Sequence, residues 1–144
     1  MGQYFDGELI SELEQYIASG EVAIVDNIDC YVDGINSRLP IKNRKLDWSA
    51  SFLAAGLEVD RRKKASAFSV FFQEVKLRYG LEGKVFYIGD GATDIVVLGD
   101  IDIFVKVLDY FVTIPQHHYF LAEDYSWFIC FSIEGDMGFD FLKN

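Results

Sequence analysis

Apolar and polar positions alternate through the last quarter of the chain, from Pro115 to Phe141. Aromatic residues are dense in this stretch, and Glu134-Gly135-Asp136 interrupts it with a tight break. A period of two is typical of strands that turn one face to the core. The stretch therefore predicts two or three successive antiparallel strands.

The middle of this stretch is apolar on both faces. The face that we expect to lie against helices carries Trp127, Ile129, Phe131 and Ile133. Phe128 and Cys130 point the other way, because successive residues of a strand face opposite sides of the sheet. The second face is then either covered by another helix or left open as a patch for a partner.

Two shorter apolar runs, 85–88 and 95–98, lie further upstream. They flank a loop rich in Gly and Asp, so we expect a hairpin or a strand, loop and strand. Asp100 is placed to cap a helix that runs to about residue 113, and Pro115 stops this helix.

Helical spacing marks the first half of the chain. We expect Asp6 to cap a helix over 7–18 that ends at Ser19-Gly20. A longer helix over 59–79 has an aromatic stripe on one side. The four basic residues 61–64 in its opening turns favour a solvated helix face over a site for an acidic surface or RNA.

Two more helices are predicted between these. One has apolar residues at i, i+4, i+8 and i+11, namely Ile24, Ile28, Val32 and Ile35. Pro40 closes this helix. The other is short, contains Trp48, Phe52 and Leu53, and ends near Gly56.

Together these elements predict an α+β fold, in which N-terminal helices pack on a mainly antiparallel C-terminal sheet with the order β-β-α-β-β-β. A chain of 144 residues, of which 51% are hydrophobic, is long enough to bury a normal core. We therefore expect a single domain over residues 1–144.

Charge is unevenly distributed along the chain, whose formal net charge is -10. Residues 1–37 hold eight acids and no Lys or Arg, residues 38–84 hold eleven bases and five acids, and residues 85–144 hold ten acids and two bases. Two of these three sectors would repel nucleic acid and attract a basic protein. Acids that only confer solubility would explain the same composition.

The same composition bears on location and redox state. No apolar run approaches the roughly 20 residues needed to cross a bilayer, and the first residues lack the pattern of a signal peptide. We therefore expect a cytoplasmic protein without a membrane partner. Cys30 and Cys130 have no CxxC spacing, and we expect both to be buried free thiols.

The string with the most catalytic character is Gly89-Asp90-Gly91-Ala92-Thr93-Asp94. It resembles the metal-binding motif of haloacid dehalogenase-like phosphatases, and oxygen ligands at this spacing suit Mg²⁺. That family also needs Asp-x-Asp-x-Thr, for which Asp26-Asn-Ile-Asp29 has one residue too many. A turn rich in Gly and Asp for conformational reasons is the favoured interpretation.

The other candidate metal ligands and nucleophiles are less well supported by their spacing. His117 and His118 are adjacent on a predicted strand, so they face opposite sides and do not readily share a metal. No serine lies in a Gly-x-Ser-x-Gly elbow. We expect no catalytic residue, no metal site and no cofactor.

The C-terminal strings carry a resemblance to a known family. Pro115-Gln-His-His-Tyr-Phe120, then Ser126-Trp-Phe-Ile-Cys-Phe-Ser-Ile-Glu-Gly-Asp136, then Phe139-Asp-Phe141 resemble the end of small bacterial immunity proteins. These proteins accompany polymorphic toxins, including those of contact-dependent growth inhibition systems. The resemblance implies a non-enzymatic protein that stays in the producing cell and binds and neutralises a toxin, often a nuclease. A nuclease usually has a basic cleft, so the acidic composition agrees with this implication.

From this resemblance and the acidic turns we expect the chain to bind a cognate toxin domain, a basic nuclease, without direct contact to nucleic acid. The residues expected to touch the toxin are Asp90, Asp94, Glu123, Asp124, Tyr125, Glu134 and Asp136. Two alternatives are a Mg²⁺-dependent phosphatase of the haloacid dehalogenase type and an adaptor for a protein other than a toxin.

Overall fold

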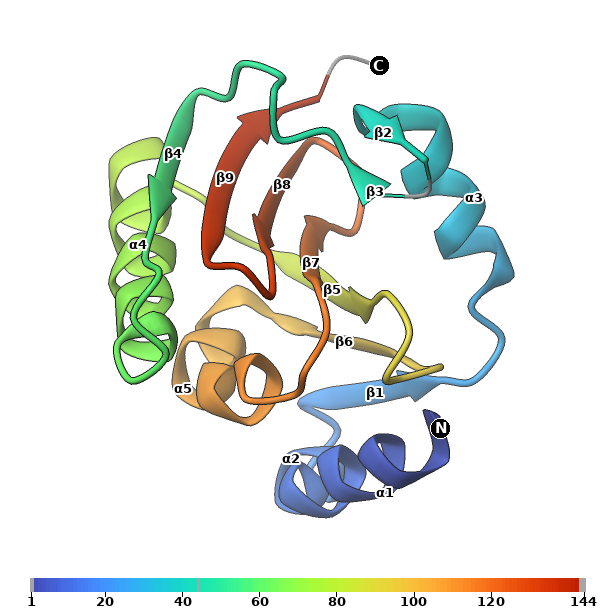
Figure 1. The fold of residues 1–144 in the computed structure, drawn as a ribbon. Helices are drawn as coiled ribbons and strands as arrows, with labels where there is room; N and C mark the ends of the chain where they lie inside the picture. The colour runs from blue at the N-terminus through green and yellow to red at the C-terminus, as the bar shows by residue number, and fades with distance from the viewer. Residues whose placement is uncertain (1, 44, 143–144) are drawn as a thin grey trace.

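The computed structural model describes residues 2–43 and 45–142. Figure 1 shows the arrangement of the elements, which in chain order are α1 (Gly2–Glu12), α2 (Glu14–Ala18), β1 (Val22–Val25), α3 (Asp29–Arg38), β2 (Ile41–Lys42), β3 (Lys45–Leu46), β4 (Ala54–Leu57), α4 (Lys64–Tyr79), β5 (Lys84–Gly89), β6 (Val96–Asp100), α5 (Ile101–Val112), β7 (His118–Ala122), β8 (Trp127–Phe131) and β9 (Asp136–Phe141).

Seven of the strands form one sheet in the order β1-β6-β5-β7-β8-β9-β4, and every neighbouring pair is antiparallel. Strands β2 and β3 pair with each other separately. The α+β class and the mainly antiparallel sheet are therefore confirmed. The sequence did not predict that the first half of the chain supplies both edges of the sheet, β1 and β4.

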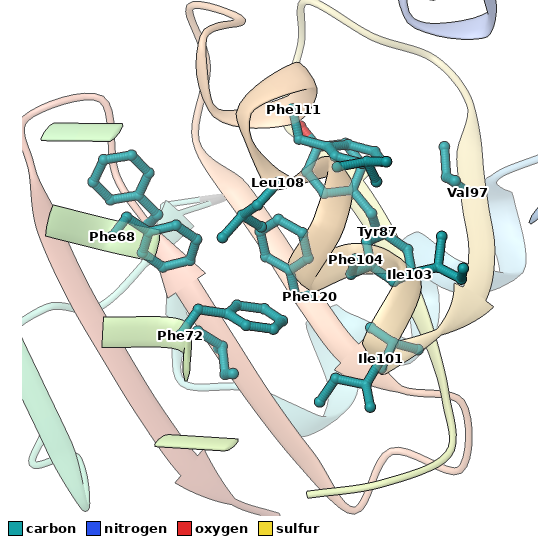
Figure 2. Packing of buried hydrophobic residues seen from close by; sticks show 14 of the residues in the cluster. Phe68, Phe72, Tyr87, Val97, Ile101, Ile103, Phe104, Leu108, Phe111 and Phe120 are labelled. Carbon is teal, nitrogen blue, oxygen red and sulfur yellow. The ribbon is translucent and has the colours of Figure 1, made fainter. Parts of the chain in front are cut away.

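Helices α4 and α5 cover one face of the sheet and form the larger core with it. Figure 2 shows phenylalanines of both helices, such as Phe68 and Phe104, converging on Phe120 of β7. The ring of Phe68 also stacks on that of Phe131 in β8, with 4.5 Å between ring centroids. Aromatic pairs of this kind add to the free energy gained by burying the rings.

Helix α3, the β2–β3 pair and the segment 48–52 cover part of the opposite face, where Phe128 and Cys130 are buried. The alternation predicted along β8 is confirmed, because Trp127, Ile129 and Phe131 belong to the first core. This second face is thus covered by the chain itself around β8. Ile133 was placed with the first core wrongly: it lies beyond the end of β8 and is 46% exposed.

Local signals of the C-terminal half agree with the structure. Asp100 caps α5, because its carboxylate accepts a hydrogen bond from the backbone N–H of Asp102 at 3.0 Å. This is the usual role of an N-cap aspartate.

No helix within the described residues is long and apolar enough to span a membrane.

Several predictions for the N-terminal half are wrong. Helix α1 begins at Gly2, so Asp6 lies inside it rather than capping it. The helix predicted through Ile24 is a strand there, and α3 begins only at Asp29. No helix forms around Trp48, where the chain leads into β4.

The predictions for the helix over 59–79 and for the two cysteines are each correct only in part. The helix predicted over 59–79 begins at Lys64, because the preceding residues form a turn in which Lys63 donates its N–H to the carbonyl of Asp60. Its predicted end is confirmed at Gly80, which takes the left-handed conformation with φ of 63°. Cys130 is buried as expected, whereas Cys30 is exposed at the start of α3.

Candidate partner-binding site

The loop between β5 and β6 carries Asp90 and Asp94 at one end of the sheet. Gly89 pairs with His118 at this end, and Val25 of β1 pairs with Val96 of β6. Figure 1 shows the start of α1, the end of β1 and this loop gathered on the right side of the molecule. Three segments that are distant in sequence therefore meet here.

The buried side chain of Gln116 holds the loop in place. Its Oε1 accepts hydrogen bonds from the backbone N–H groups of Ala92 at 2.8 Å and Thr93 at 3.1 Å. Its Nε2 donates to the hydroxyls of Thr93 and Tyr87, both at 2.9 Å. The amide therefore fixes the backbone of the loop relative to β5.

Tyr87 links Gln116 to His118. The Tyr87 hydroxyl accepts from Gln116 and shares a second hydrogen bond with Nδ1 of His118, 2.7 Å away. Burial, and secondarily the neighbouring His117, lowers the pKa of His118 to about 3. Burial also raises the pKa of Tyr87 far above its usual value. Both side chains are thus uncharged at neutral pH and serve as hydrogen-bonding groups of the interior.

His117 joins the loop to the turn between β8 and β9. Its Nδ1 accepts a hydrogen bond from the backbone N–H of Ile133 at 2.9 Å, so its ring proton sits on Nε2. That Nε2 lies 3.9 Å from Oδ2 of Asp90, whose Oδ1 accepts the backbone N–H of His117 at 2.9 Å. The two histidines have different partners, although His117 lies just before β7 and only His118 is on the strand.

Asp94 lies beside a second aspartate from the start of the chain. Its backbone N–H donates to Oδ1 of Asp6 at 2.9 Å. Burial raises the pKa of Asp6, and the charges of Asp94 and Asp26 raise it further. Asp6, Asp26 and Asp94 therefore form a cluster of like charges, which we call the acidic cluster.

A groove of about 470 Å³ runs between α3 and the β5–β6 loop. Its walls are mostly apolar and include Ile28, Val32 and Ile88, while Asp90 and Asp94 stand along one side. No Lys or Arg is among its described lining residues. An apolar groove bordered by carboxylates is suited to a side chain with an aliphatic stem and a cationic head.

Three of the predicted contact residues lie at the opposite end of the sheet. Glu123, Asp124 and Tyr125 form the turn between β7 and β8, beside Lys84 at the start of β5. Glu123 and Asp124 are exposed. The sequence-predicted residues therefore do not form one continuous surface, because Asp90 and Asp94 lie at the other end.

Tyr125 is a packing residue in this turn. Its ring lies 5.4 Å from that of Phe86 between centroids, and the guanidinium of Arg38 stacks over it at 4.3 Å. Its hydroxyl occupies the space in which a side chain on Gly34 would lie. The backbone is in the left-handed region, with φ of 62°. The ring thus anchors the C-terminal part of α3 to the sheet.

Glu134, in the turn between β8 and β9, and Asp136, the first residue of β9, lie at the same end of the sheet as Asp90. Glu134 is exposed. Asp136 is partly buried and accepts the Ser132 hydroxyl at 3.2 Å, while its backbone N–H donates to the same hydroxyl at 2.9 Å. Asp136 is therefore engaged in shaping the turn, and Glu134 is free to meet solvent.

The phosphatase-like string takes a different role in the fold. The carboxylate of Asp90 accepts a hydrogen bond from the backbone N–H of His117, and Asp94 belongs to the acidic cluster. In the part of the chain that the structure describes, no group of three or more His, Cys, Asp or Glu side chains is arranged to hold a metal ion.

Sequence reasoning missed the residues that build this end of the molecule. Gln116 was noted only as part of a string, His117 was weighed only as a metal ligand, and Asp6 was assigned to a helix cap. The spacing of Ile28, Val32 and Ile35 did indicate one helical face, and this face lines the groove. Nothing local in the sequence indicated that Asp6 would meet Asp94, 88 residues further along the chain.

The chain matches no protein-family model, no curated protein and no solved structure. Inferences about function therefore rest on the residues, on the geometry described above and on the resemblance of the C-terminal strings.

Proposed function

We propose that this chain is an immunity protein, which binds and neutralises a basic toxin domain of the nuclease class in the cytoplasm of the cell that makes the toxin. The observation that carries the proposal is the acidic cluster beside the groove. Aspartates from the start of α1, the end of β1 and the β5–β6 loop converge there.

The cluster supports a cationic partner for an electrostatic reason. Like charges brought together by folding repel one another, and the raised pKa of Asp6 reflects burial first and this repulsion in addition. A Lys or Arg from a partner would offset the repulsion while its stem enters the apolar groove. Residues that disfavour folding but fit a ligand are commonly found at functional sites.

The charge of the whole chain adds a long-range contribution. The formal net charge of -10 would attract a basic domain and speed its encounter with the chain. Nucleases usually present basic clefts to phosphates, so carboxylates in the acidic cluster would take the place of those phosphates. This mode of inhibition requires no catalytic residue in the inhibitor.

The adaptor hypothesis uses the same surface and differs only in the partner. The two are separated by what the bound protein does to a cell. An immunity protein must restore growth to cells that produce the toxin, whereas an adaptor has no such effect.

The proposal predicts that a large secreted toxin is encoded immediately upstream, and the experiment is co-expression with the C-terminal domain of that protein. We expect that domain to arrest growth alone, to be harmless with this chain, and to form a complex with it at micromolar concentration. No complex, or growth arrest that persists despite abundant folded chain, would contradict the proposal. A complex without toxicity of the partner would favour the adaptor.

A further inference from the structure

The edge strand β4 is unlike the rest of the sheet because it offers apolar side chains and free backbone groups to solvent together. It lies at the end of the sheet, with β9 as its only strand neighbour within the described residues. Figure 1 shows it at the upper left, beside α4 and on the side away from β1. The exposed fractions of Leu53, Leu57 and Val59 are 50%, 62% and 72%.

The register with β9 determines which backbone groups are free. Glu58 donates its N–H to the carbonyl of Gly135, so even-numbered residues of this segment face β9. In an antiparallel pair the residues between them point their N–H and C=O groups away. By the register with β9 these are Leu53, Ala55, Leu57 and Val59, and the turn and loop hydrogen bonds of the described residues involve none of their backbone groups.

Natural edge strands usually carry a lysine, a proline or a bulge that prevents pairing with another chain. Residues 53–59 read Leu-Ala-Ala-Gly-Leu-Glu-Val and contain none of these. The carboxylate of Glu58 is not held on the free edge, since it accepts the backbone N–H of Asp60 at 3.3 Å. The outer edge of β4 therefore has unpaired backbone groups, and no lysine or proline side chain there prevents another strand from pairing with it.

We infer that β4 pairs with β4 of a second copy of this chain about a two-fold axis at Gly56. Antiparallel pairing through the free groups places Leu53 opposite Val59 and Ala55 opposite Leu57 of the other copy. This register pairs all four outward-facing residues, and a two-fold interface requires such self-complementarity. Gly56 then meets Gly56 of the other copy at the axis, where paired backbones come closest.

Charges at the two ends of the strand fit the same arrangement. Arg61 and Arg62 lie in the turn after β4, following Asp60, and Asp140 of β9 stands next to Leu53, because Ala54 pairs with Phe139. The two-fold axis brings the arginine end of one copy to the Asp140 end of the other. The turn that carries the arginines of one copy and Asp140 of the other copy then lie at the same end of the paired strands.

The dimer leaves the candidate partner-binding site accessible. The groove and the acidic cluster lie towards β1, and β1 and β4 are the opposite edges of the sheet. Joining two sheets through β4 thus places the two grooves on the far sides of the dimer. The inference itself stands on the edge strand and does not depend on what binds the groove.

The test measures the mass of the full chain by size-exclusion chromatography with light scattering, at concentrations up to about 100 µM. We expect twice the chain mass for the wild type and the single-chain mass for Leu57→Lys. Leu77→Lys is the matched control, because Leu77 is 81% exposed but lies on α4 rather than on the edge strand, and this variant should remain a dimer. Ala55→Pro should also be monomeric, because it removes an N–H that points away from β9.

Cross-linking tests the register. A cysteine at position 56 fits, since a Cβ there meets only ordinary contacts, the nearest at 3.7 Å from Met137 and Phe71. Cα atoms at a close antiparallel pair are about 4.5 Å apart, within the range of a disulfide. Gly56→Cys in a Cys30→Ser background should form a covalent dimer on oxidation. A monomeric wild type, or a dimer that Leu57→Lys leaves intact, would overturn the inference, and a dimer that fails to cross-link would overturn the register.

Discussion

The side-chain amide of Gln116 fills the space in which a Cβ on Gly89 would lie. A side chain on the last residue of β5 would overlap the amide that fixes the β5–β6 loop, and this explains why the residue is a glycine. This contact connects the core of the sheet to the loop that carries Asp90 and Asp94.

Gly89→Ala should displace Gln116 and leave the N–H groups of Ala92 and Thr93 without their acceptor. We expect the free energy of unfolding to fall by about 2–4 kcal/mol, since both overpacking and lost hydrogen bonds contribute. Urea denaturation measures this change. Gly7→Ala is the control, because nothing lies within 4 Å of a Cβ there, and it should leave stability unchanged or slightly raised. Equal stabilities of the two variants would contradict the role of Gln116.

The buried His118 should make the protein less stable as the pH falls. Its pKa is about 3 in the fold against 6.5 in the unfolded chain, so only the unfolded chain takes up its proton between these values. The stabilising contribution is complete above pH 6.5 and is lost progressively as the pH falls towards 3, by at most about 1.4 kcal/mol per pH unit.

Unfolding free energies measured from about pH 7 to pH 5 test this linkage before most carboxylates titrate. His118→Gln should show a shallower loss of stability than the wild type, whereas His117→Gln should keep most of the wild-type slope. Parallel curves for the wild type and His118→Gln would show that His118 does not supply the pH dependence.

Tyr125 should matter for stability even without a partner. Tyr125→Ala removes a ring packed against Phe86 and Arg38, and we expect a loss of about 2–4 kcal/mol. Gly34→Ala should destabilise as well, because its new methyl group would meet the Tyr125 hydroxyl. Glu123→Gln, an exposed neighbour in the same turn, should have almost no effect. If thermal denaturation gave the same midpoint for Tyr125→Ala and the wild type, the ring would be available as a partner contact instead.

The sequence predicted correctly those elements whose defining residues are close neighbours in the chain. The cap at Asp100, the end of α4 at residue 79 and the alternation along β8 each depend on neighbouring residues, and all three are confirmed. The elements that were predicted wrongly depend on distant partners. Ile24 has helical spacing with Ile28 but pairs in the sheet with Val97, and β4 exists through its pairing with β9.

The candidate site depends on distant contacts even more strongly. Asp90 and Asp94 were predicted from their loop, but the loop is held by Gln116 and bordered by Asp6. Grouping them with Glu123 and Asp124 by acidic character alone joined two opposite ends of the sheet. Charge read along the sequence indicates the kind of partner, whereas the location of the surface follows from strand order and register.

The central proposal is that the end of the sheet that carries the acidic cluster and Asp90 binds a basic toxin domain. It is tested most directly by the association rate with that domain, measured by stopped flow at rising NaCl concentration. Asp90→Asn with Asp94→Asn should slow association about tenfold at low salt and weaken its salt dependence. The asparagine at position 90 can still accept the His117 N–H, so the loop should keep its fold. Glu123→Gln with Asp124→Asn removes the same charge at the other end and should change the rate by less than about twofold. Equal slowing by both pairs, or a rate that does not respond to salt, would contradict the assignment of this surface.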